Sequence, residues 1–358
     1  MSEPGAAMRI AVLTGGGDAP GLNAVIRAVT KSLIHQCGAE VIGVEDGYAG
    51  LIDRRVRALD WQAVSGISMR GGTLLGASNR VSPVSYQGRD RRDDVIAFAR
   101  ELRLDGLVAI GGDGTMTIAD ALDRHGLPTV GVPKTVDNDI AHVERSLGFD
   151  TAMATVSEAL DRVQTTGQSH SRVMLVETMG RHAGWLALES GLAAAADIIL
   201  LPEIDFDVEV VARVCRQREA RQRYTVICVA EGAKPRGGRL TVQAREEGRP
   251  EPVRLGGVSE VLVPQLQALL RSEVRATILG HVQRGGSPSA NDRVLGSLIG
   301  DAAANLVHTG RWGRMVSLEQ GRIGDVALAD VAGRTRTVPA DHPLLQCARR
   351  IGVSFGDA

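Results

Sequence analysis

The stretch "RIAVLTGGGDAPGLNAVIRAVTKSLI", residues 9–34, predicts a strand, a glycine-rich turn and a helix in direct succession. The apolar run at 10–13 contains β-branched residues and suits a strand that is buried on both faces. The apolar residues after the turn recur at helical spacing, namely Leu22, Val25, Ile26, Val29 and Leu33. The stretch therefore reads as the first strand–turn–helix unit of an α/β fold.

The same pattern returns along the chain. "LDGLVAIGGDGTMTIADALDRHG" predicts a strand near Leu107–Ile110 that leads through glycines into a helix. We expect further strands in "LPTVGVP", "SRVMLVETMG", "DIILLPE" and "YTVICVAEGA", and helices over Thr151–Arg162 and Val208–Gln222. Such alternation predicts parallel sheets with helices on both faces, and ligands at the carboxyl ends of the strands. A small hairpin or surface excursion is expected at 234–257, and a short helix near the end of the chain.

Composition narrows the classes of function. The 358 residues suffice for about two domains. The net charge of −1 and the 3% aromatic content argue against binding to nucleic acid or to an anionic membrane. The four cysteines form no CxxC or Cys/His cluster, so we expect reduced thiols. The start "MSEPGAAMRI" lacks the pattern of a signal peptide and no apolar run is long enough to span a bilayer, so we expect a cytoplasmic location.

Two glycine turns suit phosphate groups. In "TGGGDAPG", residues 14–21, glycines let backbone N–H groups approach an anion at a helix N-terminus. The turn is neither a P-loop nor GxGxxG, and a tight turn that needs glycine explains it equally well. "GGDGT", residues 111–115, is more specific, because Asp113 after a buried strand can hold Mg²⁺ beside a polyphosphate. Two such loops at neighbouring strand ends favour phosphate binding.

The stretch "GVPKTVDNDI", residues 131–140, has the residue types that phosphoryl transfer needs. Transfer to an alcohol requires a base, positive charge over the moving group, and fixed alignment. One of Asp137 and Asp139 could take the proton while the other faces a metal or holds the loop. Thr135 and Lys134 could serve the phosphoryl oxygens. An Asx-rich turn is the alternative, but a Lys in a chain whose 41 basic residues are nearly all Arg indicates that a compact ammonium is wanted.

Further basic residues lie near predicted strand ends in "SHSR", "VETMGRHAG" and "RATILGHVQRGGSP". Together they could clamp a phosphorylated substrate, since Arg forms bidentate contacts with phosphate. Any one Arg is more often a solvated surface residue, and His281 alone is as often structural, so the interpretation rests on the group. Its members are Arg172, Arg181, Arg275, His281 and Arg284.

In this combination the sequence resembles the 6-phosphofructokinase family. The motifs occur in the family's order from about Arg9 to beyond Arg293: "LTGGGDAPGLNA", "DGYAGL", "GGTLLG", "GGDGT", "PKTVDNDI", "GRHAGW" and "LGHVQRGGSPSANDR". NAD and lipid kinases share "GGDGT" alone. The resemblance implies phosphoryl transfer from ATP to the 1-hydroxyl of fructose 6-phosphate. It also implies two Rossmann-like three-layer lobes with the site in the cleft between them: 8–148 plus about 283–335 for the nucleotide, and 149–282 plus about 336–358 for the sugar phosphate.

The resemblance assigns roles to individual residues. Gly17, Gly112, Gly114 and Thr115 would hold the nucleotide phosphates, with Asp113 on Mg²⁺. Asp137 would be the base, assisted by Thr135, Arg181, Lys134 and Asp139 around the transferring group. The sugar phosphate site would be lined by Val136, Met179, Gly180, Glu231, His281, Val282, Gln283 and Arg284. Arg172 and Arg275 would reach it from a neighbouring subunit, which requires a homo-oligomer, a dimer or a tetramer. Arg80, with Arg89 as competitor, would contact the nucleotide.

The donor and the regulation depend on departures from the family pattern. Many ATP-using bacterial members have Gly where Lys134 stands, whereas pyrophosphate-using members have that Lys together with an Asp in place of Gly114. Such an Asp would crowd and repel the α-phosphate of ATP, so Gly114 predicts ATP, with pyrophosphate as the alternative. A non-catalytic sensor is disfavoured because the three aspartates of the site are present. Arg27 matches the family's effector site, but Lys31 and Gln164 replace arginines, which argues against regulation by ADP or phosphoenolpyruvate.

Overall fold

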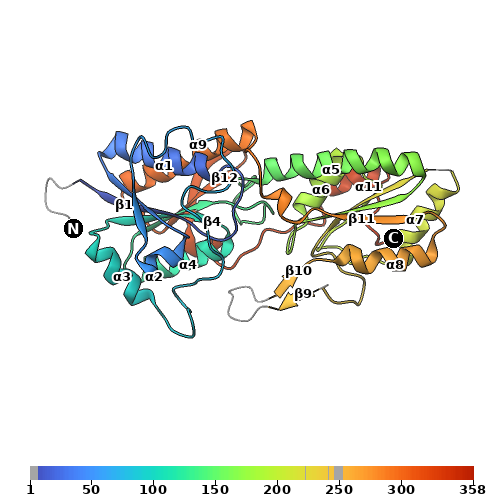
Figure 1. The fold of residues 1–358 in the computed structure, drawn as a ribbon, viewed down its shortest axis with the longest axis horizontal. Helices are drawn as coiled ribbons and strands as arrows, with labels where there is room; N and C mark the ends of the chain where they lie inside the picture. The colour runs from blue at the N-terminus through green and yellow to red at the C-terminus, as the bar shows by residue number, and fades with distance from the viewer. Residues whose placement is uncertain (1–6, 222, 241, 246–252) are drawn as a thin grey trace.

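The computed structural model describes residues 7–221, 223–240, 242–245 and 253–358. The chain forms two α/β units that lie side by side along its long axis (Figure 1). We call the unit built on the seven-stranded sheet the first lobe and the unit built on the four-stranded sheet the second lobe. Each is a sheet between two layers of helices, as the alternation of predicted strands and helices indicates.

The sheet of the first lobe is mainly parallel. Its order is β13-β12-β5-β4-β1-β2-β3, and only the edge strands β3 and β13 run antiparallel to their neighbours. Neither these two strands nor β2 and β12 were among the strands expected from the sequence. The bounds are β1 Arg9–Thr14, β2 Glu40–Val44, β3 Val56–Leu59, β4 Gly106–Gly111, β5 Thr129–Pro133, β12 Arg314–Glu319 and β13 Arg322–Ala327.

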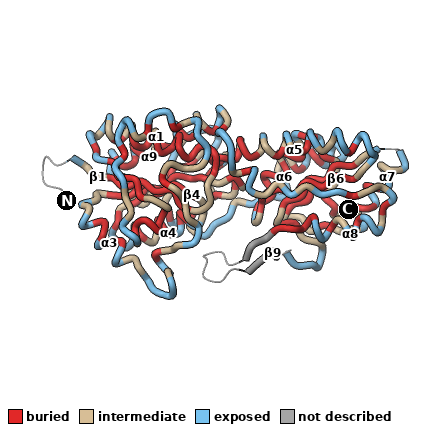
Figure 2. Tube along the Cα trace, in the orientation of Figure 1, coloured by how far each residue is buried: buried red, intermediate tan, exposed pale blue. Residues whose placement is uncertain are grey.

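Helices cover both faces of this sheet. One face packs against α1 (Leu22–Cys37) and α9 (Ala290–His308), which also pack against each other. The opposite face packs against α2 (Tyr48–Asp53), α3 (Arg92–Glu101), α4 (Asp113–Arg124) and α10 (Leu328–Val331). The helical spacing predicted after the first glycine turn is confirmed, because its five apolar residues are all buried. Figure 2 shows the buried strands between partly exposed helices.

The sheet of the second lobe is entirely parallel, with the order β11-β6-β8-β7. Its strands are β6 (Val173–Thr178), β7 (Ile198–Leu200), β8 (Thr225–Ala230) and β11 (Val274–Ile278), and the 3-10 helix η1 (Gly280–Gln283) follows β11. One face packs against α5 (Phe149–His170), α6 (Trp185–Ala193) and α11 (Pro343–Arg350). The other packs against α7 (Val208–Glu219) and α8 (Val258–Leu269).

Most predicted elements of the second lobe are present, with changed bounds. The helix expected over Thr151–Arg162 continues to His170, and the one expected over Val208–Gln222 ends at Glu219, while Gln222 lies outside the described residues. The hairpin expected at 234–257 is an antiparallel pair of β9 (Val242–Arg245) and β10 (Val253–Leu255). The short helix near the end is α11.

The chain passes between the lobes after β5, after η1 and again after α10. The first two crossings follow strand ends that carry predicted motifs, so the carboxyl ends of both sheets lead toward the junction of the lobes. The third crossing runs from α10 to α11, as the dark orange to red trace in Figure 1 shows. The fold thus places the polar motifs of both lobes at their junction.

No helix among the described residues has the length and apolar character needed to cross a membrane.

Candidate active site

The two glycine turns pack against a shared support. β1 and β4 are neighbours in the first sheet, and each ends in one of the turns. A Cβ added at Gly15 would lie 2.6 Å from the hydroxyl of Thr115, and one added at Gly111 would lie 2.2 Å from it. Side chains at either position would collide with Thr115, which is buried. Glycine is therefore required for packing at these two positions, and Thr115 supports both turns.

The second turn opens helix α4. Gly112 is its N-cap in an extended conformation, and Asp113 is the first residue of the helix. One carboxylate oxygen of Asp113 accepts a hydrogen bond of 3.0 Å from the backbone N–H of Gly333. A Cβ added at Gly114 would meet nothing within 4 Å. This helix N-terminus therefore borders open space and can receive an anion such as a phosphate.

Lys134 lies at the base of the first glycine turn. It follows β5, only 3% of it is exposed, and its ammonium group donates a hydrogen bond to the carbonyl of Gly17. Burial, and then the charge of Arg284, lower the pKa of Lys134 to about 7. Three carboxylates act against this shift: those of Asp18, Asp139 and Asp137. Lys134 therefore joins the first glycine turn to the aspartates that follow it in sequence.

Beyond Lys134, burial alternates along the chain. Thr135, Asp137 and Asp139 are half-buried, whereas the residues between them are buried. The Asp137 N–H donates to the Thr135 hydroxyl at 3.1 Å. The predicted substrate residue Val136 is 0% exposed and belongs to the core of the second lobe. Its assignment to the substrate site is therefore not supported by its placement, because Val136 presents no surface to a ligand and holds the segment from beneath.

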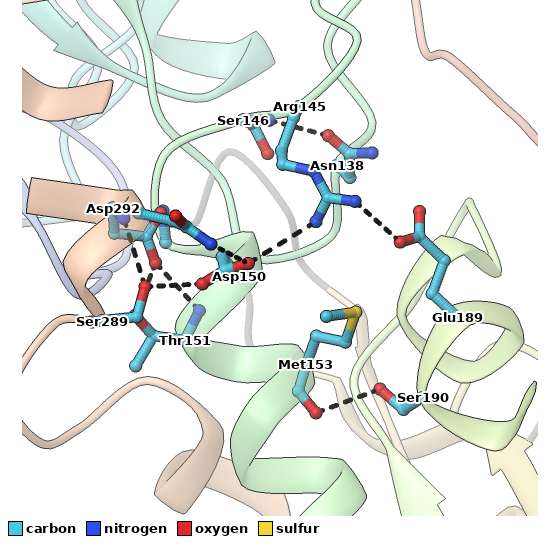
Figure 3. Close-up of polar contacts among 12 residues, drawn as sticks. Asn138, Arg145, Ser146, Asp150, Thr151, Met153, Glu189, Ser190, Ser289 and Asp292 are labelled. Atoms are coloured by element: carbon cyan, nitrogen blue, oxygen red, sulfur yellow. Dashed lines mark hydrogen bonds and ion pairs between the residues drawn. The ribbon is translucent and has the colours of Figure 1, made fainter. Parts of the chain in front are cut away.

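Asn138 shapes the turn between the two aspartates. It has a positive φ of 54°, a conformation that Asn tolerates better than most residues. Its side-chain oxygen accepts from the Ser146 N–H at 2.8 Å, and its amide donates to the Glu144 carbonyl at 3.1 Å. Figure 3 shows Asn138 beside Ser146, with Arg145 reaching Glu189 on α6 at 3.0 Å. Asn138 is thus a buried structural residue that fixes the turn between the half-buried Asp137 and Asp139.

The second lobe contributes an acidic and a basic residue from neighbouring strand ends. The Gly232 N–H donates to the Gly180 carbonyl at 3.1 Å, and a Cβ at Gly232 would lie 2.1 Å from the Arg181 carbonyl. This close approach places Glu231 beside Arg181. The pKa of Glu231 is raised to about 7, first by burial and then by the charge of Asp137. Glu231 and Asp137 come from different lobes. The effect of the Asp137 charge on Glu231 therefore indicates that the two halves of the predicted site lie near each other.

Two predicted residues after β11 have different roles. Gln283 is completely buried, its side-chain oxygen accepts from the Met179 N–H at 3.1 Å, and its amide donates to the Gly280 carbonyl at 2.9 Å. It therefore fixes local backbone. Arg284 donates at 2.9 Å to the carbonyl of Asp18 in the first lobe. Arg284 thus joins the crossing after η1 to the first glycine turn, whereas His281 and Val282 are exposed on η1.

Arg172 and Arg275 lie away from this group. Arg172 precedes β6, Arg275 is in β11 beside Met174, and both form ion pairs with Glu273, Arg172 at 2.5 Å. The chain runs from Arg172 to Met179 along β6, which at about 3.3 Å per residue spans roughly 23 Å. These arginines are therefore at the amino edge of the second sheet, and the structure does not bring them to the residues at its carboxyl edge.

Two adjoining cavities lie beside the first glycine turn. The first, of about 310 Å³, is lined by Gly16, Gly17, Asp18, Thr73 and Asn79 among others. The second, of about 480 Å³, shares Asn79 and adds Asp46, Arg55 and Arg80. Arg80 thus lines a cavity, whereas Arg89 lies in a turn whose backbone exchanges hydrogen bonds with Tyr86 at 2.8 and 3.0 Å. Thr73 and Asp46 were not predicted as site residues, although the motifs "GGTLLG" and "DGYAGL" contain them.

A buried polar joint fixes the lobes to each other. Asp292 near the start of α9 accepts from the backbone N–H groups of Gly148 and Thr151 at 2.8 and 2.9 Å, and from the Thr151 hydroxyl at 2.5 Å. Ser289 donates to Asp150 at 2.6 Å. Figure 3 shows these side chains of α9 meeting the first turn of α5. The motif "SANDR" therefore serves to join the lobes.

Comparisons with known proteins agree with this arrangement. The family profile described as Phosphofructokinase matches residues 9–307. The chain is 48% identical to an ATP-dependent 6-phosphofructokinase 2 of Streptomyces coelicolor over 94% of this chain and 98% of the relative. It is 45% identical to a pyrophosphate–fructose 6-phosphate 1-phosphotransferase of the same organism, over 98% of this chain and 100% of the relative. A solved phosphofructokinase from Saccharomyces cerevisiae matches with a TM-score of 0.76 and 31% identity, covering 90% of this chain and 45% of that longer chain.

Proposed function

The chain belongs to the phosphofructokinase family, and from this premise we propose that it transfers the γ-phosphoryl group of ATP to the 1-hydroxyl of D-fructose 6-phosphate. The products are fructose 1,6-bisphosphate and ADP. The observation that carries the proposal is the position of Asp137. Its charge acts on Lys134 beneath the first glycine turn and on Glu231 in the second lobe. A base so placed lies between a phosphate-binding side and a side suited to a polar acceptor.

In the proposed reaction Asp137 accepts the proton of the 1-hydroxyl. The sugar oxygen then forms a bond to the γ-phosphorus, the bond from that phosphorus to the bridging oxygen breaks, and ADP leaves with its electron pair. Lys134, Thr135 and Arg181 stabilise the negative charge of the transferring group. Asp139 favours the charged form of Lys134 by raising its pKa against the effect of burial.

Mg²⁺ fits the acidic residue at the second glycine turn. Magnesium in such sites binds one or two carboxylates together with substrate phosphates and water. Asp113 provides a half-buried carboxylate at the start of α4, next to the open space in front of Gly114. We propose that Asp113 holds the ion, which when bound neutralises charge on the nucleotide phosphates.

The space beside the glycine turns supports ATP as the donor. A site that binds only pyrophosphate needs no room beyond the phosphates. A site that binds ATP must also accommodate the nucleoside. Gly114 borders open space, and the second cavity adjoins the first through Asn79 and includes Arg80. Pyrophosphate remains the second candidate, because Lys134 resembles the pyrophosphate type and one relative is named for that donor.

The donor is tested by measuring fructose 1,6-bisphosphate formation with Mg²⁺ and either ATP or pyrophosphate. Turnover with ATP alone is the expected result. Turnover with pyrophosphate alone would refute the proposed donor but keep the reaction class, and no turnover with either would favour a sensor. In Asp137→Asn we expect kcat to fall by about 100-fold or more with fructose 6-phosphate binding retained. Unchanged kcat would remove Asp137 as the base.

We further propose that the sugar phosphate site is completed by a second copy of the chain. In one chain it would comprise Met179, Gly180, Arg181, Glu231, His281, Val282 and Arg284, with the buried Gln283 fixing the backbone of Met179 and Gly280. The proposal is supported by the positions of Arg172 and Arg275 at the far edge of the sheet. β11 is an edge strand of this sheet, its last residue Ile278 is 45% exposed, and Val282 on the following η1 is 60% exposed. The proposed boundaries, 8–148 with 283–335 and 149–282 with 336–358, follow the crossings of the chain.

Mixed oligomers test the shared site. Asp137→Asn removes the base and Arg172→Ala removes an arginine given to the neighbour, so each variant alone should be nearly inactive. After unfolding and refolding together, an oligomer with both subunits would contain one intact site, and activity should return toward about a quarter of wild type for a random dimer. Refolding each variant alone is the control. No recovery in a mixture that does form hybrids would refute the shared site.

A further inference from the structure

The third crossing, residues 332–342, makes polar contacts with both lobes. Near its start, the Gly333 N–H donates to Asp113 at 3.0 Å. Thr335 then pairs with Ile140, the residue after Asp139, in an isolated antiparallel β-bridge. Farther along, the Val338 N–H donates to the Glu203 carboxylate at 2.8 Å. The same carboxylate accepts from the N–H of Gly184, three residues after Arg181. The crossing therefore runs behind residues on both sides of the proposed site.

Arg336 is central to this crossing. Its backbone N–H donates to the carbonyl of Asp139 at 2.7 Å, and its guanidinium donates to the carbonyl of Asn138 at 2.9 Å. One residue thus holds two successive carbonyls of the turn that follows Asp137. The other side of this turn is held by the Ser146 and Glu144 contacts of Asn138. Together, the contacts of Arg336 and of Asn138 hold the turn after Asp137 from both sides.

The opposite side of Arg336 is anchored in the second lobe. Its guanidinium carbon lies 3.9 Å from the ring centroid of Trp185, a cation–π contact, and the indole N–H donates to the Arg336 carbonyl at 3.0 Å. Trp185 is only 2% exposed and begins α6. The ring of His342 packs edge-on against Trp185 with centroids 4.9 Å apart. The guanidinium group of Arg336 therefore stacks on a buried indole ring that is itself held in place by His342.

We propose that Arg336 is a positioning residue that sets the spacing between the Asp137 base and the Arg181 turn across the junction of the lobes. This inference rests on the proposed function and concerns how its geometry is held. Arg336 acts through the Asn138–Asp139 backbone on one side and through Trp185 on the other. Alignment of reacting groups is sensitive to shifts of about 1 Å, which can cost roughly 100-fold in rate. A residue that merely stabilised the fold would change the fraction of folded enzyme and leave kcat per folded site unchanged.

Three variants test the proposal in the full-length enzyme. Arg336→Met keeps the length of the side chain but removes the donor to Asn138 and the charge over Trp185. Arg336→Lys keeps the charge and one donor but lacks the planar guanidinium. Arg334→Met is the matched control, because Arg334 is exposed in the same crossing. For each we would measure kcat, both KM values and thermal unfolding, with kcat scaled to folded protein.

We expect Arg336→Met to lower kcat by about 100-fold with both KM values within about 3-fold of wild type. Arg336→Lys should recover part of that loss, and Arg334→Met should match wild type. Wild-type kcat in Arg336→Met, or a loss confined to KM, would overturn the inference. If Arg336→Met does not fold, Arg336→Lys decides, since a kcat equal to wild type would then overturn it. An inactive wild-type enzyme would instead count against the proposed function itself.

Discussion

Replacing Gly114 with Asp tests whether the open space at this position selects ATP. A Cβ at Gly114 would meet nothing within 4 Å, so a side chain can enter without displacing its neighbours. Residue 114 is in the first turn of α4, where the helix macrodipole favours a carboxylate by about 0.3–1 kcal/mol. The variant should fold as well as wild type, and its effect should fall on the donor.

The size of the effect follows from charge repulsion. A carboxylate about 5 Å from one phosphate charge, at an effective dielectric constant of about 20, is repelled by roughly 3 kcal/mol. Residue 114 is exposed, so screening by solvent reduces this figure. A remaining penalty of about 1.4–2.7 kcal/mol corresponds to a loss of roughly 10- to 100-fold in kcat/KM for ATP.

The assay compares kcat/KM with ATP and with pyrophosphate in wild type, Gly114→Asp and Gly114→Ala. Alanine adds the Cβ without the charge and should stabilise the helix by about 0.5–1 kcal/mol. We expect Gly114→Asp to lose activity with ATP, pyrophosphate turnover, if any, to stay within about 3-fold, and Gly114→Ala to resemble wild type. An equal loss with both donors, or undiminished ATP turnover in Gly114→Asp, would refute the reasoning from space and charge.

Three further predictions follow from buried ionisable groups. The pKa of Lys134 is about 7, and only its charged form neutralises phosphate. Wild-type kcat/KM for ATP should therefore fall above pH 7, and Lys134→Met should lack that fall. A flat wild-type pH profile would contradict this prediction. The pKa of Glu231 rises from 4.5 to about 7 on folding, so the unfolded chain releases this proton at lower pH than the native state does. The stability of wild type therefore decreases as the pH is raised from about 4.5 to about 7. Urea unfolding should therefore show Glu231→Gln more stable than wild type by about 1–3 kcal/mol at pH 8 and equal to it near pH 4, whereas equal differences at both pH values would be inconsistent. Asp292→Ala should lower the free energy of unfolding by about 3 kcal/mol, because three donors at the polar joint lose their acceptor. Its control is Asp301→Ala at an exposed position of the same helix, which should change that free energy by less than about 0.5 kcal/mol. Similar losses in both variants would count against the joint.

Local patterns in the sequence were sufficient for the fold class and for six of the parallel strands, β1, β4, β5, β6, β7 and β8, but not for β2 and β12. The strand after Arg9 and the helix from Leu22 follow from period and turn chemistry, and both are present. The glycine turns were located for the same reason, since glycine between a buried strand and a helix has a local signature. The motif order identified the family before any contact was known, and the comparisons confirm it. These features depend on residues that are neighbours in sequence.

Contacts between distant residues could not be derived in that way. Val136 and Gln283 lie in recognisable motifs, yet the structure buries them, because packing of the second lobe decides which side of a segment faces the core. Arg336 looks like any other Arg in an Arg-rich chain, yet it lies 198 residues beyond the Asn138 carbonyl that it binds. The sequence by itself determined which chemical groups the site has and the local elements that carry them. Only the tertiary structure decided which of them meet, because burial and hydrogen bonding between lobes depend on the path of the whole chain and not on local spacing.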